Sequence, residues 1–259
     1  QATWNQFYEA GVSIERIADV LDLDAEQSPE EFTTRVVLPT IRGNIRFDNV
    51  SFGYDVRRQI LFDVSFDIPA GHTVAVVGSS GAGKTTFLKL LTREIVPTRG
   101  QVLLNGRNIT RLRPREVPYL RRTARMIFQD YKLLPNKTVY DNVAFALMVI
   151  EKPLRQIGPS VDEALKLVGL ESKAAAYPDE LSGGEQQRVS IARAIVGNPT
   201  ILLADEPTGN LDMETSWDIM EVLLRVNRRG TTVIMSTHNA AIVDGLKQRV
   251  IELNNGRIV

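Results

Sequence analysis

A glycine-rich string, Gly78 to Thr86, holds the residues best suited by type and spacing to chemistry on a polyphosphate. It has the spacing G-x-x-x-x-G-K-T and follows an apolar run, residues 73–77. Glycines let consecutive backbone N–H groups and the positive end of the next helix point at anionic oxygens. Lys84 adds a full charge for β- and γ-phosphates, and the Thr85 hydroxyl suits a Mg2+ ligand. We therefore predict a phosphate-binding loop rather than an ordinary glycine-rich turn. The predicted nucleotide-binding residues of this loop are Gly78, Ser79, Ser80, Gly81, Ala82, Gly83, Lys84, Thr85 and Thr86.

Two adjacent carboxylates, Asp205 and Glu206, end the apolar run 201–204. Neighbouring side chains on a strand point in different directions, so the two acids can hold different roles. We predict that Asp205 holds Mg2+ through water and that Glu206 polarises an attacking water. The alternative is an acidic strand end in solvent, and the phosphate loop elsewhere in the chain favours the functional interpretation.

A second anion-binding terminus is predicted where Ser182, Gly183 and Gly184 precede an apolar helical pattern. Serine is a preferred N-cap residue, and the N-terminus of a helix attracts anions. An ordinary capped helix is the alternative. The phosphates of one nucleotide need one such cradle, yet this chain has two.

The elements that position these residues can be read from apolar spacing. Two β-type runs, 44–52 and 60–68, flank a polar turn at 54–59 and predict an antiparallel lobe ahead of the phosphate loop. Three short apolar runs at residues 126–128, 201–204 and 232–235 favour buried parallel strands with their chemistry at the carboxyl ends. After the phosphate loop, Phe87, Leu88, Leu91 and Ile95 predict one helix face. Helical spacing between Gln129 and Pro199 predicts an inserted helical lobe, at about residues 130–195.

Composition narrows the class of protein. The chain has 259 residues, is 43% hydrophobic, has zero formal net charge and contains no cysteine. Disulfide frameworks, thiolate metal sites and cysteine nucleophiles are therefore excluded, and charge offers no general attraction to nucleic acid. The longest apolar run, Val143 to Ile150, is too short to cross a bilayer. No signal peptide opens the chain, so we expect a cytosolic unit; Gln1 in place of Met suggests a fragment or a processed chain.

With these motifs in order, residues 41–259 resemble the nucleotide-binding domain of an ABC ATPase. The resemblance implies an α/β fold: a P-loop NTPase (RecA-like) core with an antiparallel β lobe and an inserted α-helical lobe. Residues 1–40 are expected to form an exporter-like helical tail and linker.

The resemblance also implies roles for single residues. Tyr54 would stack on adenine, although a tyrosine packed within the lobe is the alternative. Gln129 resembles the glutamine that senses Mg2+ and the γ-phosphate, and Asp212 belongs to a string like the D-loop, which crosses to a partner subunit. His238 follows the last core strand and resembles the switch histidine that contacts the γ-phosphate. His72 has no such context and is expected in a turn.

In this family, the string Ser182, Gly183, Gly184, Glu185 and Gln186 completes the site of a second copy. A γ-phosphate held by one loop still has an exposed face, which a second helix terminus can cover. The resemblance thus implies ATP and Mg2+ as cofactors, with Thr85, Gln129 and Asp205 as metal ligands. It also implies an ATP-dependent dimer, a membrane-embedded partner and a position at the inner face of the cell membrane.

Two branches of the family resemble different parts of the chain. From Phe87 onward the strings resemble FtsE-like cell-division ATPases, which serve an FtsX-like membrane subunit. Residues 1–86 resemble an exporter, whereas Ala176 to Glu180 stand where an exporter would show Thr-Glu-Val-Gly. We hypothesise a chimera, natural or engineered, joined near the phosphate loop.

ATP hydrolysis that drives a membrane partner is the predicted function. The membrane partner is expected to dock on Tyr131 to Asn142, where Leu133 and Leu134 are predicted to be exposed. One alternative is a nucleotide-gated dimerisation module, or a chimera, with little turnover. Another is a soluble ABC ATPase acting on DNA or ribosomes, but tandem cassettes or a coiled-coil insertion would then be expected. The seven arginines between Arg107 and Arg125 are interpreted as a solvated face rather than a nucleic-acid groove.

Overall fold

The computed structural model describes residues 42–55 and 57–259. The helical tail and linker expected at 1–40 lie outside the described residues.

A six-stranded sheet, in the order β10-β9-β3-β8-β7-β6, forms the centre of the molecule. All pairings are parallel except that of the edge strand β10 with β9. The strands that carry the predicted chemistry are short and almost wholly buried, as expected for parallel strands covered on both faces. Their register aligns Asp205 with Ser236 and Val77 with Thr237, so the carboxyl ends meet at one edge. The bounds are β3 (Thr73–Val77), β6 (Ala124–Ile127), β7 (Ile201–Asp205), β8 (Thr232–Thr237), β9 (Arg249–Asn254) and β10 (Arg257–Ile258).

A four-stranded antiparallel sheet, in the order β2-β1-β4-β5, packs beside the central one. Its strands are β1 (Ile45–Asp55), β2 (Arg58–Ile68), β4 (Arg99–Leu104) and β5 (Arg107–Asn108). The antiparallel lobe predicted from the first two runs is therefore present. Its turn is shorter than predicted, because β1 continues through Tyr54 to Asp55, which pairs with Arg58. The sequence analysis did not identify β4 or β5.

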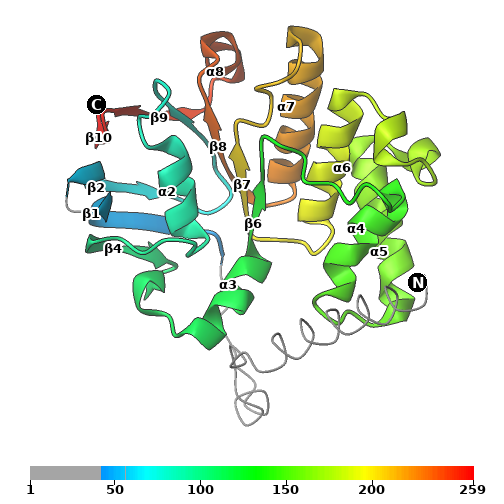
Figure 1. The fold of residues 1–259 in the computed structure, drawn as a ribbon, viewed down its shortest axis with the longest axis horizontal. Helices are drawn as coiled ribbons and strands as arrows, with labels where there is room; N and C mark the ends of the chain where they lie inside the picture. Colours follow the sequence, from blue (N-terminus) through cyan, green and yellow to red (C-terminus); the bar gives the residue numbers. More distant parts are fainter. Residues whose placement is uncertain (1–41, 56) are drawn as a thin grey trace, which may run out of the picture.

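Three helices gather on the other side of the molecule, with β6 and β7 between them and the antiparallel strands (Figure 1). They are α4 (Val139–Met148), α5 (Leu154–Val168) and α6 (Gly183–Ile195). Two of them bury an apolar face: Val161, Ala164, Leu165 and Val168 on α5, and Val189, Ala192, Ile195 and Val196 on or next to α6. Because each face needs a neighbour, the three helices pack together and form one continuous core with the central sheet.

The remaining helices connect or cover the strands. They are α2 (Lys84–Leu91), α3 (Val117–Thr123), α7 (Met213–Arg228), α8 (Ala240–Leu246) and the short 3-10 turns η2 (Ile109–Arg111), η3 (Pro114–Glu116), η4 (Glu171–Lys173) and η5 (Pro178–Glu180). Two predicted boundaries were wrong. Helix α2 ends at Leu91 because Arg93 takes a positive φ of 57°, which leaves Ile95 outside it. Strand β6 runs from Ala124 to Ile127 and does not include Phe128.

None of the helices formed by the described residues is long and apolar enough to cross a membrane.

Candidate functional site

The glycine-rich string forms a tight loop between β3 and α2. Gly78 and Gly83 have φ values of 151° and 103°, which side chains rarely permit. A Cβ at Gly78 would lie 2.2 Å from the Leu253 carbonyl oxygen, and one at Gly83 would lie 2.8 Å from a Leu61 methyl group. Both glycines are therefore required by the loop's conformation and by close packing, and the loop is fixed to β9 and β2.

Lys84 begins α2 and is 5% exposed. Its Nζ donates to the carbonyl oxygens of Gly78 at 2.8 Å and Ser79 at 3.1 Å. The same ammonium group lies 3.5 Å from Glu206 Oε1. A buried cation is costly unless it is paired, so these contacts hold the charge beneath the loop.

Asp205, at the end of β7, collects two hydroxyl groups on one carboxylate oxygen. Thr85 Oγ1 donates to Asp205 Oδ1 at 3.2 Å, and Ser236 Oγ donates to it at 2.7 Å. Ser236 aligns with Asp205 on the neighbouring strand β8. The parallel register thus fixes the Asp205 carboxylate beside the first turn of α2.

Glu206 follows β7 with a positive φ of 48°, a conformation that non-glycine residues adopt infrequently and at a cost. Its N–H is shared between Ser236 O at 3.2 Å and Ser236 Oγ at 3.0 Å. Its Oε2 lies 3.0 Å from Nδ1 of His238. The carboxylate is therefore held between the Lys84 ammonium group and the imidazole.

Gln129 approaches the same carboxylate from the segment after β6. A Cβ placed on Gly209 would lie 3.1 Å from Gln129 Nε2 and 3.5 Å from Glu206 Oε2. Gln129 itself is exposed. The glycine at 209 leaves room for both polar side chains.

Tyr54 lies near the end of β1 and is 54% exposed. Its ring meets Phe52 edge-on, with centroids 4.9 Å apart. A tyrosine packed within the lobe would be covered, so this half-open ring is free to stack on a planar ligand.

The second predicted anion site begins α6. Ser182 is its exposed N-cap: Ser182 Oγ accepts from the Glu185 N–H at 3.3 Å, and Glu185 Oε2 accepts from the Ser182 N–H at 2.8 Å. This reciprocal pair is a capping box. The Ser182 N–H, with help from Lys173, lowers the pKa of Glu185 below its ordinary value. Gln186 turns back into the preceding loop, where its Nε2 donates to the Pro178 and Leu181 carbonyls.

Asp212 caps the N-terminus of α7. Its carboxylate accepts from the Thr215 hydroxyl at 2.6 Å and from the Thr215 N–H at 2.9 Å. These two bonds lower the pKa of Asp212. The residue is exposed.

The structure brings Lys84, Thr85, Asp205, Glu206 and His238 into one cluster at the carboxyl edge of the sheet, with Gln129 beside it. It does not bring Ser182 there. Helices α2 and α6 lie on opposite sides of β6 and β7 (Figure 1). A single copy therefore presents two separate polar surfaces, each with one helix N-terminus.

Ser236 is a member of this cluster that the sequence analysis did not single out. The sequence does contain a signal that could have predicted it: Ser236 and Thr237 are polar residues at the carboxyl end of a buried strand, as Asp205 and Glu206 are. His72 follows the turn between β2 and β3, as predicted.

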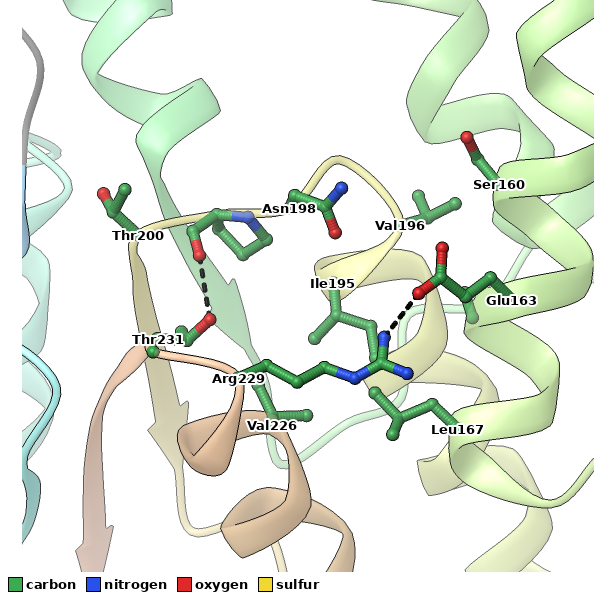
Figure 2. Close-up of a pocket in the computed structure, with 13 residues that line it drawn as sticks. Ser160, Glu163, Leu167, Ile195, Val196, Asn198, Thr200, Val226, Arg229 and Thr231 are labelled. Atoms are coloured by element: carbon green, nitrogen blue, oxygen red, sulfur yellow. Dashed lines mark hydrogen bonds and ion pairs between the residues drawn. The ribbon is translucent and has the colours of Figure 1, made fainter.

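Two further features, an arginine-rich segment and a cavity, lie outside the cluster. The arginine-rich segment uses several side chains structurally: Arg107 pairs with Glu116, Arg121 donates to the Thr92 carbonyl and Arg122 lies over Tyr119. A cavity of about 240 Å3 opens beside α5 (Figure 2). The Glu163–Arg229 ion pair at 2.8 Å lies in it. Thr200 and Thr231, which also line it, precede β7 and β8, so the cavity lies at the amino edge of the sheet, away from the cluster.

The exposure predicted for Leu133 and Leu134 was wrong. Both are half-buried, and Leu133 packs against the large core. The buried side chain of Asn142 explains this: its amide bonds both the N–H and the carbonyl of Leu134 and the carbonyls of Lys137 and Thr138. The segment is thereby tied onto α4.

A phosphate loop at the carboxyl edge of a parallel sheet, with an antiparallel lobe on one side and a helical lobe on the other, defines a P-loop NTPase of the cassette class, as predicted. The family model "ABC transporter" matches residues 61–209. This chain belongs to the ABC transporter family, and it is an ATP-binding domain that hydrolyses ATP.

The cell division ATP-binding protein FtsE of Streptococcus pneumoniae is 51% identical over 206 residues, which are 80% of this chain and 90% of that protein. The solved structure of cbiO1 from Clostridium perfringens, part of the ABC transporter complex cbiONQ, is similar with a TM-score of 0.78 and 29% identity, over 83% of this chain and 86% of that one. A dimeric post-hydrolysis state of the cassette MJ0796, bound to ADP and Pi, has a TM-score of 0.72 and 34% identity, over 83% and 96% of the two chains.

The resemblance to FtsE-like ATPases was confirmed, but the chimera hypothesis gains no support. Residues 87–259 are only about two thirds of the chain, whereas the FtsE alignment covers 80% of it. The similarity to FtsE therefore extends upstream of the proposed junction, into the antiparallel lobe.

Proposed function

We propose that ATP is hydrolysed at a composite site, in which the Lys84 loop of one copy and the Ser182 terminus of a second copy enclose the triphosphate. One observation carries this proposal: a single copy keeps the N-termini of α2 and α6 on different surfaces, and Ser182 is exposed, its side chain making only its own cap among the described residues. The dimeric relative bound to ADP and Pi supports it.

The binding part of the proposal follows from charge and exposure. Lys84 exchanges its two loop carbonyls for the β- and γ-phosphates, which are stronger acceptors for an ammonium group. The N–H groups of the loop and the start of α2 surround the same oxygens. Tyr54 offers its open face to adenine.

The donors near Asp205 fit Mg2+. Those in the cluster are oxygens, the Thr85 hydroxyl and the Asp205 carboxylate, and we propose that the side-chain carbonyl of Gln129 turns in as a further ligand. Among the described residues no cluster of three or more His, Cys, Asp or Glu side chains could hold a metal, which agrees with an ion held by one carboxylate, phosphates and water. When bound, Mg2+ would neutralise charge on the phosphates.

The proposed catalytic roles follow from the contacts of Glu206. Its carboxylate accepts the proton of the attacking water, and His238 orients that carboxylate through the 3.0 Å contact. Gln129 Nε2 lies near Gly209, as Glu206 Oε2 does, and we propose that Gln129 positions the water. The Lys84 ammonium group stabilises the charge that develops on the phosphate.

The rate of ATP hydrolysis against protein concentration tests the composite site. A site shared by two copies predicts a rise steeper than linear at low concentration, because dimers form in proportion to the square of monomer concentration. A site within one copy predicts a strictly linear rise. Glu206→Gln is expected to reduce kcat about 10²- to 10⁴-fold while ATP binding persists. Equal rates for Glu206→Gln and the parent would contradict the catalytic role and favour a nucleotide-gated dimerisation module.

We further propose that the membrane partner docks in a groove beside the predicted segment, rather than on Leu133 itself. This groove, of about 480 Å3, is lined by Phe128, Leu134, Phe145 of α4 and Val149, which directly follows α4. Phe145 and Val149 are 47% and 61% exposed, so an apolar surface continues out of it.

The polar lining of the groove indicates the chemistry of the partner. Four cations, Arg121, Arg125, Lys132 and Arg193, and one acid, Glu94, line the groove; Lys132 also pairs with Asp130 at 3.7 Å. A partner segment with apolar residues and acidic neighbours would complement it. Similarity to FtsE favours an FtsX-like subunit, and such a partner would hold the chain at the inner face of the cell membrane.

A matched pair of variants tests this docking groove in membranes that contain the partner. Phe145→Asp is expected to abolish the partner's stimulation of ATP hydrolysis without changing the basal rate. Leu154→Asp, at an 83% exposed position outside the lining, is expected to keep the stimulation. Equal stimulation of both variants would place docking elsewhere.

A further inference from the structure

Gln187 is a fully buried amide in the second turn of α6, five residues after Ser182. Its Nε2 donates to the carbonyl oxygen of Pro207 at 2.9 Å. The nitrogen must face Pro207, because a carbonyl oxygen only accepts hydrogen bonds. This bond joins α6 to the segment that begins at Glu206.

A contact at Pro207 affects the backbone directly next to Glu206. Glu206 has the infrequent φ of 48°, and its N–H is already fixed by Ser236. Pro207 has no N–H of its own, so its carbonyl is its only backbone hydrogen-bonding group. Ser236 on one side and Gln187 on the other therefore fix the backbone that aims the Glu206 carboxylate.

The first turn of α6 packs on the rest of the same loop. A Cβ at Gly183 would lie 3.4 Å from a Leu211 methyl group, and one at Gly184 would lie 2.3 Å from the Thr215 methyl group. This close packing leaves little room for α6 to move without moving residues 206–215. A displacement of the helix start is thus passed to the loop that carries Glu206.

We propose that Gln187 is a positioning residue that connects the Ser182 terminus, which one copy offers to its partner, with the Glu206 of that same copy. The inference rests on the composite site proposed above. Contact of Ser182 with the partner's ATP then sets the orientation of the copy's own Glu206, so the two sites of the dimer turn over together.

Gln187→Met separates this role from simple packing. Methionine is close to glutamine in shape, and it removes both the donor to Pro207 and the Oε1 atom, which has no partner among the described residues. Only the Pro207 carbonyl loses a bond, so the variant is expected to fold. We expect kcat to fall about tenfold, KM for ATP to stay within twofold, and the Hill coefficient for ATP to fall toward one.

Asn227→Leu is the matched control. Asn227 Nδ2 likewise donates from a helix to backbone carbonyls, those of Gly71 and Thr231 at 2.8 and 2.9 Å, but at the amino edge of the sheet. Loss of its bonds is expected to lower Tm while leaving kcat and the Hill coefficient of the folded protein unchanged.

Three results would overturn the proposal. They are an unchanged kcat and Hill coefficient in Gln187→Met, the same kinetic loss in Asn227→Leu, and failure of both Gln187→Met and the shorter Gln187→Asn to fold, which would make Gln187 purely structural. A linear concentration dependence in the parent would instead contradict the composite site, whereas the kcat ratio of Gln187→Met to parent would still measure positioning of Glu206.

Discussion

The phosphate loop leads into the N-terminus of α2, and Ser182 caps the N-terminus of α6, yet the polar contacts around the two helix starts differ. Around the loop, Lys84 contacts two backbone carbonyls and Glu206, and Thr85 contacts Asp205. Around Ser182, the polar contacts in the described part of the chain include the capping box, the bonds from Gln186 to the Pro178 and Leu181 carbonyls, and the pair of Glu185 with Lys173 at 3.6 Å.

A single chain therefore assembles the loop side of the site by itself, whereas it only presents the Ser182 side as a surface for a second copy. The loop side is already organised for chemistry, since donors and carboxylates are fixed by the register of β7 and β8. On the Ser182 side, the contacts cap the start of α6 and leave Ser182 exposed. Each of the following predictions tests whether the loop side carries the chemistry and the Ser182 side completes the site of a second copy.

Mixing two inactive variants tests most directly whether the two sides of the site come from different copies. Lys84→Ala removes the loop charge and Ser182→Arg blocks the presented terminus, and each is expected to lower kcat at least about 10²-fold. A mixed dimer still contains one intact composite site, made from the loop of the Ser182 variant and the terminus of the Lys84 variant. Phosphate release should therefore recover on mixing.

Lys84→Ala mixed with Glu206→Gln gives the opposite control, because both changes affect the loop side of the site. In this mixture each loop side carries a defect and little recovery is expected. Recovery in neither mixture would favour a site complete within one copy.

His238→Ala tests how much the imidazole contributes to the loop side of the site. The imidazole contacts Glu206 Oε2 rather than replacing it, so its loss is expected to lower kcat about 10- to 10²-fold, less than loss of the carboxylate. In the double variant with Glu206→Gln, the His238 change should add almost nothing, because residues that act as a unit are not additive. Additive losses in single-turnover measurements would indicate independent roles.

Gly78→Ala measures how firmly the loop is held. The new Cβ would meet the Leu253 carbonyl oxygen at 2.2 Å with φ at 151°, and we expect the free energy of unfolding to fall by about 2–3 kcal/mol. Gly81→Ala is the control, since a Cβ there meets nothing within 4 Å although φ is 80°; about 1 kcal/mol is expected. Equal losses in denaturant unfolding would contradict the predicted contact.

Glu185→Gln has the smallest expected effect and tests the cap of the Ser182 side. Hydrogen bonding from the Ser182 N–H lowers the pKa of Glu185 from 4.5, so its charge stabilises the folded state above that pH. The contribution is lost as pH falls through the lowered pKa. Glutamine keeps the cap without the charge, and we expect a loss of about 0.5 kcal/mol at pH 7. That difference should vanish at pH values below the lowered pKa; a difference independent of pH would contradict the electrostatic origin.

Local strings allowed the phosphate loop, the acids at 205 and 206, the Ser182 cap and the α/β class to be predicted from the sequence. Each depends on neighbours a few residues apart, such as glycines beside a lysine or a serine three residues before a glutamate. The same reasoning misplaced the end of α2 and the exposure of Leu133, because a positive φ at Arg93 and the buried amide of Asn142 have no strong local signature.

Only the tertiary structure decided which residues far apart in the sequence form hydrogen bonds with one another. Thr85 and Ser236 meet on Asp205 across 120 and 31 positions, and Gln187 meets Pro207 across 20. These contacts depend on strand register and helix packing, which the long-range burial of whole faces determines. The separation of Ser182 from Lys84 has the same cause: the helical lobe buries its apolar faces on one side of the sheet, and its polar terminus lies away from the loop.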